Sequence, residues 1–282
     1  MNRYGTEGVN IVIYRIIIMQ QIFINMAHDF ITISTTLAQY AGGHTGYGTY
    51  SSLSLLGLGI IIIVGIIGAV IQSNMMASMR RFSSTHAPYT GAEVARAMLQ
   101  ANGITDVRVT HTPGQLTDHY NPADRTVNLS ESVYASRSVA AMAVAAHECG
   151  HAIQHARMYP WLKLRSELVP LVNIGSRLGQ IVLTIGLFML IGGNNTTVAW
   201  IGLALFGSTT LFSLVTLPVE FDASRRALAW LQSSGVADRA MHGQAQTALR
   251  WAAMTYVAAA LSSIAMLVYY VFIILSHSNN RR

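Results

Sequence analysis

The sequence has few charged residues. Only 11% of its 282 residues are Asp, Glu, Lys or Arg, and 52% are hydrophobic, whereas soluble domains carry roughly 25% charged residues. This deficit of charge is typical of a membrane protein. The formal net charge is +6, but the cations lie near the apolar runs and in one polar stretch. They therefore indicate membrane orientation and argue against a nucleic-acid-binding surface.

Lysine and cysteine each occur once, as Lys163 and Cys149. A single cysteine cannot form an intrachain disulfide, so cysteine content does not indicate the redox compartment. Cys149 lies in the motif discussed below. On a helix it would point about 200° away from the neighbouring His147, so we expect it to be a small buried residue and not a metal ligand.

Long apolar runs predict four membrane-spanning helices, because a span needs about 20 apolar residues. We expect them at 53–76, 174–192, 197–217 and 251–275. The second and third, within 174–217, are separated by the turn residues "GGNN" at 192–195.

The first 45 residues have an uncertain status as an N-terminal extension. Their apolar run contains Arg15, and an arginine inside the bilayer is costly, so a fifth span there is the less favoured alternative. A signal peptide is also not favoured, since no clear cleavage site of small residues follows the run.

Two polar segments remain, at 77–167 and 218–250. With four spans, both must lie on the same side of the membrane. Arginines are concentrated in these two segments, while the loop near 193–197 has none. The positive-inside rule then predicts that both segments lie on the cytoplasmic side of the cell membrane.

The larger polar segment has a readable order of elements. "TGAE" at 90–93 has the spacing of a helix capping box, formed by Thr90 and Glu93. "VRVTHT" at 107–112 and "RTVNLS" at 125–130 alternate as strands do, and turn residues between them predict a β-hairpin. An alanine-rich helix is expected at about 138–157.

The stretch "AHECGHA" within this last helix places His147 and His151 four residues apart. On an α-helix both side chains point to one face, one turn apart. Two imidazoles at this spacing can bind one tetrahedral zinc ion that keeps a position open for water. Glu148 lies beside the first histidine and can serve as the general base that takes a proton from this water.

A third zinc ligand must come from elsewhere in the chain. His155 continues the same helix face but lies a further turn away, so a supporting role suits it better. The stretch "PVEFD" offers Glu220, where a span leaves the membrane, and Asp222 is the alternative. These two side chains lie about 200° apart on a helix, so only one could bind zinc, and the other could orient a histidine.

Three further polar residues are candidates for a role near the metal. His119 and Tyr120 in "TDHYNP" could donate a hydrogen bond to the oxyanion of a tetrahedral intermediate. The simpler alternative is that this stretch only forms a turn. Arg225 could have the same oxyanion role, or it could anchor the end of a span at the membrane.

With these residues in place, the chain resembles the bacterial neutral zinc metallopeptidases of the YugP-like membrane family. The resemblance covers roughly residues 48–275. It implies a multi-pass membrane protein with a zinc-dependent peptidase activity. It is carried, in order, by "TGAEVARAML", "TDHYNP", "LSESVY", "AVAAHECGHAIQHA", "LKLRSELVP", "LVTLPVEFDASRRAL" and "WAAMTYVAAAL".

A weaker similarity links the chain to membrane metalloproteases of the CAAX-prenyl-protease and HtpX type. Those proteins have a glutamate ligand in a downstream helix, with an aspartate four residues later. Glu220 matches the glutamate, but Ser224 stands where the aspartate would be.

The predicted fold class is therefore mainly α: a multi-pass membrane protein with about four transmembrane helices and a cytoplasmic, zincin-like segment containing a small β-hairpin or sheet. The predicted function is a zinc-dependent endopeptidase. Its partners would be the lipid bilayer and a protein or peptide substrate close to it. The alternative is a zinc-binding membrane scaffold or quality-control partner without proteolysis. A metal transporter is disfavoured, because the expected spans have no Asp, Glu or His at their centres.

Overall fold

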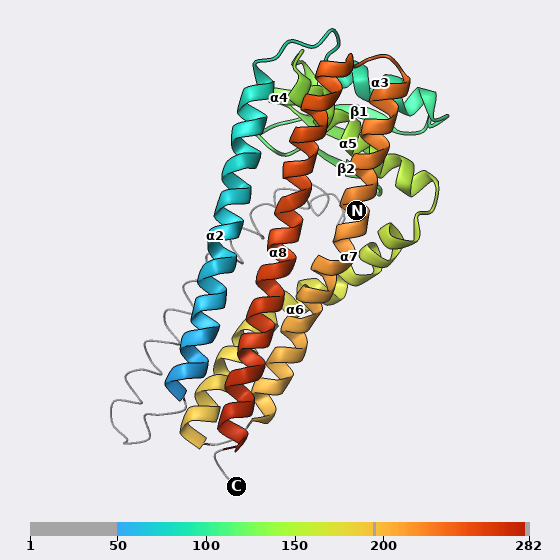
Figure 1. Cartoon of the computed structure of the whole chain (residues 1–282). Helices are drawn as coiled ribbons and strands as arrows, with labels where there is room; N and C mark the ends of the chain where they lie inside the picture. Colours follow the sequence, from blue (N-terminus) through green and yellow to red (C-terminus); the bar gives the residue numbers. More distant parts are fainter. Residues whose placement is uncertain (1–49, 194–195, 280–282) are drawn as a thin grey trace. The chain divides into compact units, whose positions relative to one another are not determined.

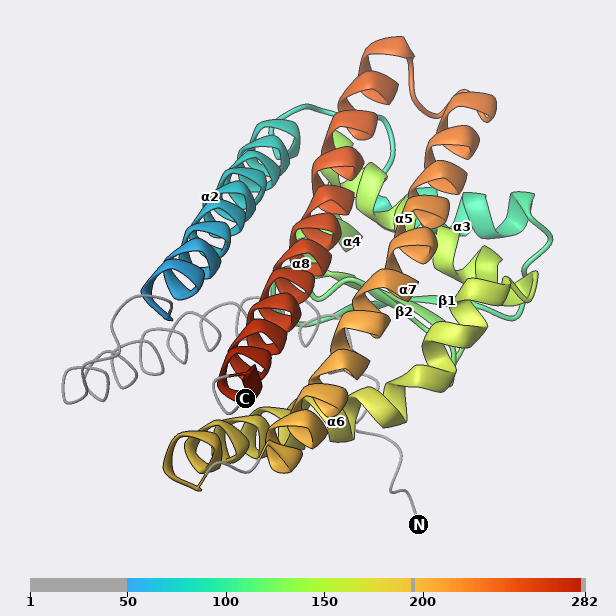
Figure 2. The ribbon, with the colours of Figure 1, turned by 60° about the horizontal axis from the view of Figure 1, so that its bottom comes forward.

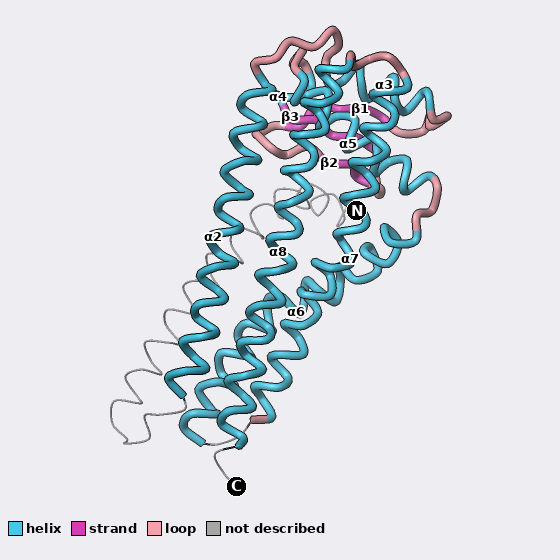
Figure 3. Tube along the Cα trace, in the orientation of Figure 1, coloured by secondary structure: helices cyan, strands magenta, loops and turns pink. Residues whose placement is uncertain are grey.

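The computed structural model describes residues 50–193 and 196–279, and the N-terminal extension at 1–45 lies outside them. The described chain is mainly helical with one small sheet (Figures 1 and 3). In chain order the elements are α2 (Tyr50–Ser83), α3 (Gly91–Ala101), β1 (Arg108–Thr112), β2 (His119–Asn121), β3 (Thr126–Ser130), α4 (Glu131–Tyr134), α5 (Val139–Ala156), α6 (Pro160–Gly193), α7 (Thr197–Ser233) and α8 (Arg239–Asn279).

Four helices are long and apolar enough to cross a membrane, which confirms the predicted number of spans. They are α2, α6, α7 and α8. Each continues beyond the expected span into polar sequence; α7, for example, reaches Ser233 instead of stopping near 217. An apolar run marks only the part of a helix that hydrocarbon can surround. The hydrogen-bonded backbone can continue into polar sequence without interruption.

The described residues form two compact units. One contains Arg165–Val215 together with described parts of 50–69 and 257–279. Its helices pack closely. At Gly202 of α7, for instance, an added Cβ atom would lie 2.3 Å from the backbone nitrogen of Leu183 in α6. Small residues permit this approach between membrane helices. The core of this unit consists of Leu183, Leu187, Leu190, Ala199, Leu203, Phe206, Met266, Tyr269, Tyr270 and Ile274.

The other unit contains Val70–Leu164 and Thr216–Tyr256, and α5 runs through its core. Its N-cap is Ser138, whose hydroxyl accepts a hydrogen bond from the Ala141 amide at 3.2 Å. The alanine-rich sequence then favours an uninterrupted helix. Nearly the whole of α5 is buried against its neighbours. The predicted capping box at the start of α3 is also confirmed, with Thr90 and Glu93 bonded to each other's backbone.

The sheet differs from the predicted hairpin. β1 and β3 do pair, with Arg108 opposite Thr126, but they run parallel. The short strand β2 lies between them in sequence and pairs with β3 in the antiparallel sense, so the order in space is β1-β3-β2. Figure 2 shows this small sheet, with β1 and β2 labelled. The hairpin is therefore β2–β3. Alternation of side chains identifies a strand but carries no information on its direction in the sheet.

Candidate metal centre

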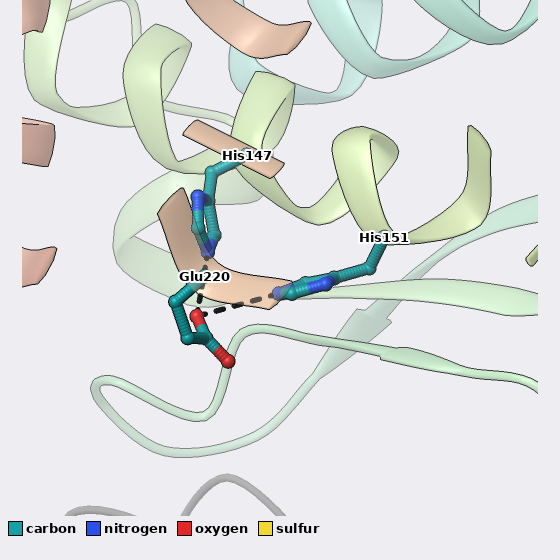
Figure 4. Close-up of side chains that lie close together, drawn as sticks. All are labelled: His147, His151 and Glu220. Atoms are coloured by element: carbon teal, nitrogen blue, oxygen red, sulfur yellow. Dashed lines mark hydrogen bonds and ion pairs between the residues drawn. The ribbon is translucent and has the colours of Figure 1, made fainter. Parts of the chain in front are cut away.

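Helices α5 and α7 bring together three side chains that can bind a metal. The ligand atoms of His147, His151 and Glu220 all lie within 4.8 Å of one another. One oxygen of Glu220, Oε2, is 3.3 Å from Nε2 of His147 and 3.6 Å from Nε2 of His151 (Figure 4). Among the described residues, this is the one group of three or more His, Cys, Asp or Glu side chains with such a geometry.

A close contact between the two helices sets the position of Glu220. A Cβ atom added at Gly150 of α5 would lie 2.6 Å from the carbonyl oxygen of Ala223 in α7. That distance is too short for any real side chain, so only glycine lets the two backbones meet here. Gly150 lies between the histidine pair on α5 and Ala223 follows Glu220 on α7, and this contact therefore supports the metal centre directly.

The three side chains fit a zinc ion. Two ligands of a tetrahedral zinc at about 2.0–2.1 Å lie about 3.3 Å apart, which is close to the two distances measured from Glu220. The site is also buried, with Glu220 1% exposed and His151 4% exposed. Nε2 of His151 has no hydrogen-bond partner among the described residues. A buried polar atom without a hydrogen bond is costly, and coordination of a metal ion would satisfy it.

The second nitrogen of each histidine is held by a neutral side chain. Nδ1 of His147 lies 3.1 Å from the hydroxyl of Ser224, and Nδ1 of His151 lies 3.0 Å from Oε1 of Gln154. Hydrogen bonds of this kind orient imidazoles toward a metal. Ser224 is the residue that departs from the aspartate of the HtpX-type proteins, and in this chain it contacts the first histidine of the motif.

Asp222 is not one of the three side chains that form this cluster. Its carboxylate accepts hydrogen bonds from Arg225, Arg226 and the amide of Gln154. Arg225, a candidate for oxyanion stabilisation, thus contacts Asp222, and its side chain is 77% exposed. Through Gln154, Asp222 is connected to His151.

Glu148 lies on the buried side of α5, next to strand β2. The backbone amide of Tyr120 donates a hydrogen bond to Oε2 of Glu148 at 3.0 Å. Tyr120 lies opposite Val127 in the β2–β3 ladder. Strand β2 is at the edge of the sheet, and the Tyr120 amide faces Glu148 there. Strand β2 therefore orients the carboxylate that follows His147.

The phenol of Tyr120 contacts the last histidine of α5. Its oxygen lies 2.7 Å from Nδ1 of His155. Burial raises the pKa of Tyr120 to about 12, so the phenol keeps its proton at neutral pH. His155 therefore has Tyr120 as a hydrogen-bond partner and is not part of the metal cluster. The spacing along α5 had already predicted that it lies outside the ligand set.

His119 is held within the sheet. Its Nδ1 lies 2.7 Å from the carbonyl oxygen of Thr117 and its Nε2 lies 3.2 Å from the side-chain amide of Asn128. The preceding Asp118 accepts hydrogen bonds from the amide and the hydroxyl of Ser130. Burial raises the pKa of Asp118, although these hydrogen bonds oppose the shift. Both residues thereby position β2 beside Glu148.

Cys149 is a buried residue on the far side of α5, as predicted. Its thiol is fully buried and donates to the carbonyl oxygen of Ala95 at 3.5 Å. Burial raises the pKa of Cys149, so the thiol stays neutral and does not offer a thiolate to a metal.

Gln154 was missed by the sequence reasoning. It follows His151 by three residues and is completely buried. The available signal was its place in an alanine-rich helix, three residues after His151, since an amide that is buried there must find partners for its oxygen and nitrogen.

Long apolar helices and a buried two-histidine, one-glutamate cluster are the features of a membrane protein with a metal site. A comparison with known families agrees. The family described as "Putative neutral zinc metallopeptidase" matches residues 58–275. The chain belongs to this family, and zinc is its cofactor.

A relative with a similar sequence supports the same assignment. The chain is 42% identical over 207 residues to a protein of Bacillus subtilis (strain 168) named "Putative membrane protease YugP". The match covers 73% of this chain and 90% of the relative. No solved structure matches the chain.

Proposed function

We propose that this protein is a zinc-dependent endopeptidase that hydrolyses peptide bonds of membrane-associated proteins or peptides. One observation carries the proposal: His147, His151 and Glu220 present ligand atoms within 4.8 Å of one another. A carboxylate, Glu148, directly follows the first of them. A site that only held a metal for structural reasons would need no acid or base at this position.

Each residue of the site has a distinct part in this proposal. His147, His151 and Glu220 would hold the zinc. When bound, zinc supplies Lewis-acid chemistry, which makes water more acidic and polarises a peptide carbonyl. Glu148 would take the proton from the attacking water and later give it to the amine leaving group. Its hydrogen bond from the Tyr120 amide holds the carboxylate in one orientation for both proton transfers.

The proposed substrates are proteins or peptides at the bilayer. The third ligand, Glu220, is carried by α7, and the same helix contains one of the four candidate spans. A peptide bond must therefore come close to a membrane helix to reach the site, which favours chains that are themselves attached to the membrane.

The expected result of metal removal is a loss of cleavage. Protein stripped with a chelator should hydrolyse casein or a membrane-anchored reporter at least about 100-fold more slowly, and zinc at one equivalent should restore the rate. Magnesium and calcium should not, because they prefer oxygen ligands to imidazole. Circular dichroism would check that the stripped protein stays folded. A stripped protein that cleaves as fast as the zinc-loaded one would contradict the proposal.

We also propose that the catalytic residues face the cytoplasm. The polar segments 77–167 and 218–250 carry most of the arginines, as the positive-inside rule requires of cytoplasmic segments. In a Cys149→Ala background, a cysteine at exposed Gln232 should react with a membrane-impermeant maleimide only after the cells are permeabilised. A cysteine at Thr196, in the loop between α6 and α7, should react in intact cells. The opposite pattern would reverse the orientation.

A further inference from the structure

The side chain of Gln154 makes contacts on both sides of the metal centre. On one side, its Oε1 lies 3.0 Å from Nδ1 of His151. On the other side, its Nε2 donates to the carbonyl oxygen of Val219 at 2.8 Å and to Oδ2 of Asp222 at 2.9 Å. Gln154 is completely buried. A single amide therefore connects a histidine of α5 with the turn of α7 that carries Glu220.

The partners of Gln154 determine which way its amide points. A backbone carbonyl can only accept a hydrogen bond, and so can the carboxylate of Asp222, which Arg225 and Arg226 keep ionised by donating to it. The amide nitrogen must therefore lie on this side. The amide oxygen is left facing His151, and since an amide oxygen can only accept, Nδ1 of His151 must carry the proton.

The position of this proton has a consequence for His151. A neutral imidazole has one protonated nitrogen and one with a lone pair. With the proton on Nδ1, the lone pair of His151 is on Nε2, and Nε2 lies 3.6 Å from the carboxylate of Glu220. Two electron-rich atoms at this distance repel each other unless a cation lies between them.

We propose that Gln154 is a positioning residue for the metal centre: it fixes the tautomer and the ring orientation of His151 and ties α5 to α7 next to Glu220. The inference rests on the proposed metal site of His147, His151 and Glu220. Arg226 and Arg225 hold Asp222, Asp222 and Val219 orient Gln154, and Gln154 orients His151. The charge of Asp222 thus acts on the metal ligand only through a neutral amide.

Replacing the amide by an apolar side chain of similar length tests the proposal. Gln154→Met should raise the zinc dissociation constant by about 10- to 100-fold, the range expected for loss of a partner that orients a metal ligand. It should also change the visible absorption spectrum of the cobalt-substituted protein, because the coordination geometry is disturbed. The matched control is Gln100→Met, at an exposed position of α3, which should leave both measurements unchanged. Unchanged zinc affinity and an unchanged cobalt spectrum in Gln154→Met would overturn the proposal.

A second measurement uses the wild-type chain and does not depend on the folding of a variant. In metal-free protein labelled with 15N-histidine, the imidazole of His151, assigned with a His151→Gln sample, should carry its proton on Nδ1. A free histidine side chain favours Nε2 for this proton, so the Nδ1 form indicates that Gln154 orients the ring before metal binds. A proton on Nε2 would overturn the proposal. Neither measurement requires peptidase activity, so failure of the proposed function would be seen separately.

Discussion

Glu148→Gln is expected to lower the rate of peptide hydrolysis by about 10³-fold, within the usual range for loss of a general base. The variant should bind zinc as tightly as the wild type. The amide is nearly the same size as the carboxylate, and its oxygen can still accept the hydrogen bond that the Tyr120 amide donates to Oε2 of Glu148. What the amide lacks is the basicity needed to take a proton from water.

The measurement is hydrolysis of casein or a membrane-anchored reporter at matched zinc content. Glu131→Gln is a suitable control, since Glu131 is an exposed carboxylate in the first turn of α4. A Glu148→Gln variant that keeps most of the activity would rule out Glu148 as the base. If the same variant also replaced the wild type fully in a deletion strain, the alternative of a zinc-binding scaffold would be favoured.

Glu220→Ala is expected to weaken zinc binding by more than about 100-fold, beyond the loss that follows from removing a partner of a ligand. Oε2 of Glu220 lies 3.3 Å and 3.6 Å from the two histidine nitrogens, so this carboxylate is placed to complete the ligand set. Asp222→Ala should still bind one equivalent of zinc at saturating concentration, although less tightly, because Asp222 supports Gln154 and does not reach the metal.

Metal analysis and competition with a chelator would measure both variants side by side. Loss of zinc in Asp222→Ala together with normal binding in Glu220→Ala would make Asp222 the third ligand. An equal loss of zinc binding in both variants would leave the third ligand unassigned, with only the two histidines as established ligands. The comparison is informative because the two carboxylates are separated by a single residue on the same helix.

The parts of the fold that depend on local sequence could be predicted. Thr90 and Glu93 form their capping box with each other, and His147 and His151 share a face because they are four residues apart on one helix. The four spans likewise follow from apolar runs. All of these features are decided within one element, so no knowledge of the tertiary structure is required.

The parts that depend on contacts between elements were harder to predict. The direction of β1 relative to β3 depends on the path of 113–125, and nothing in the alternation of the strands encodes it. The hydrogen-bond partners of the histidines could not be predicted for the same reason. In the sequence Ser224 is only a departure from an aspartate, and Gln154 acquires its role from Val219 and Asp222, which lie more than 60 residues further along the chain.

The contact at Gly150 has a consequence for the size of the metal centre. The carbonyl of Ala223 already lies against the Cα atom of Gly150, so α5 and α7 cannot move closer together at this level. This steric contact between the two backbones sets a minimum separation between the histidine pair on one helix and Glu220 on the other. A methyl group at position 150 would widen this gap. The dimensions of the ligand cage are therefore determined by a residue that has no side chain and takes no part in the chemistry.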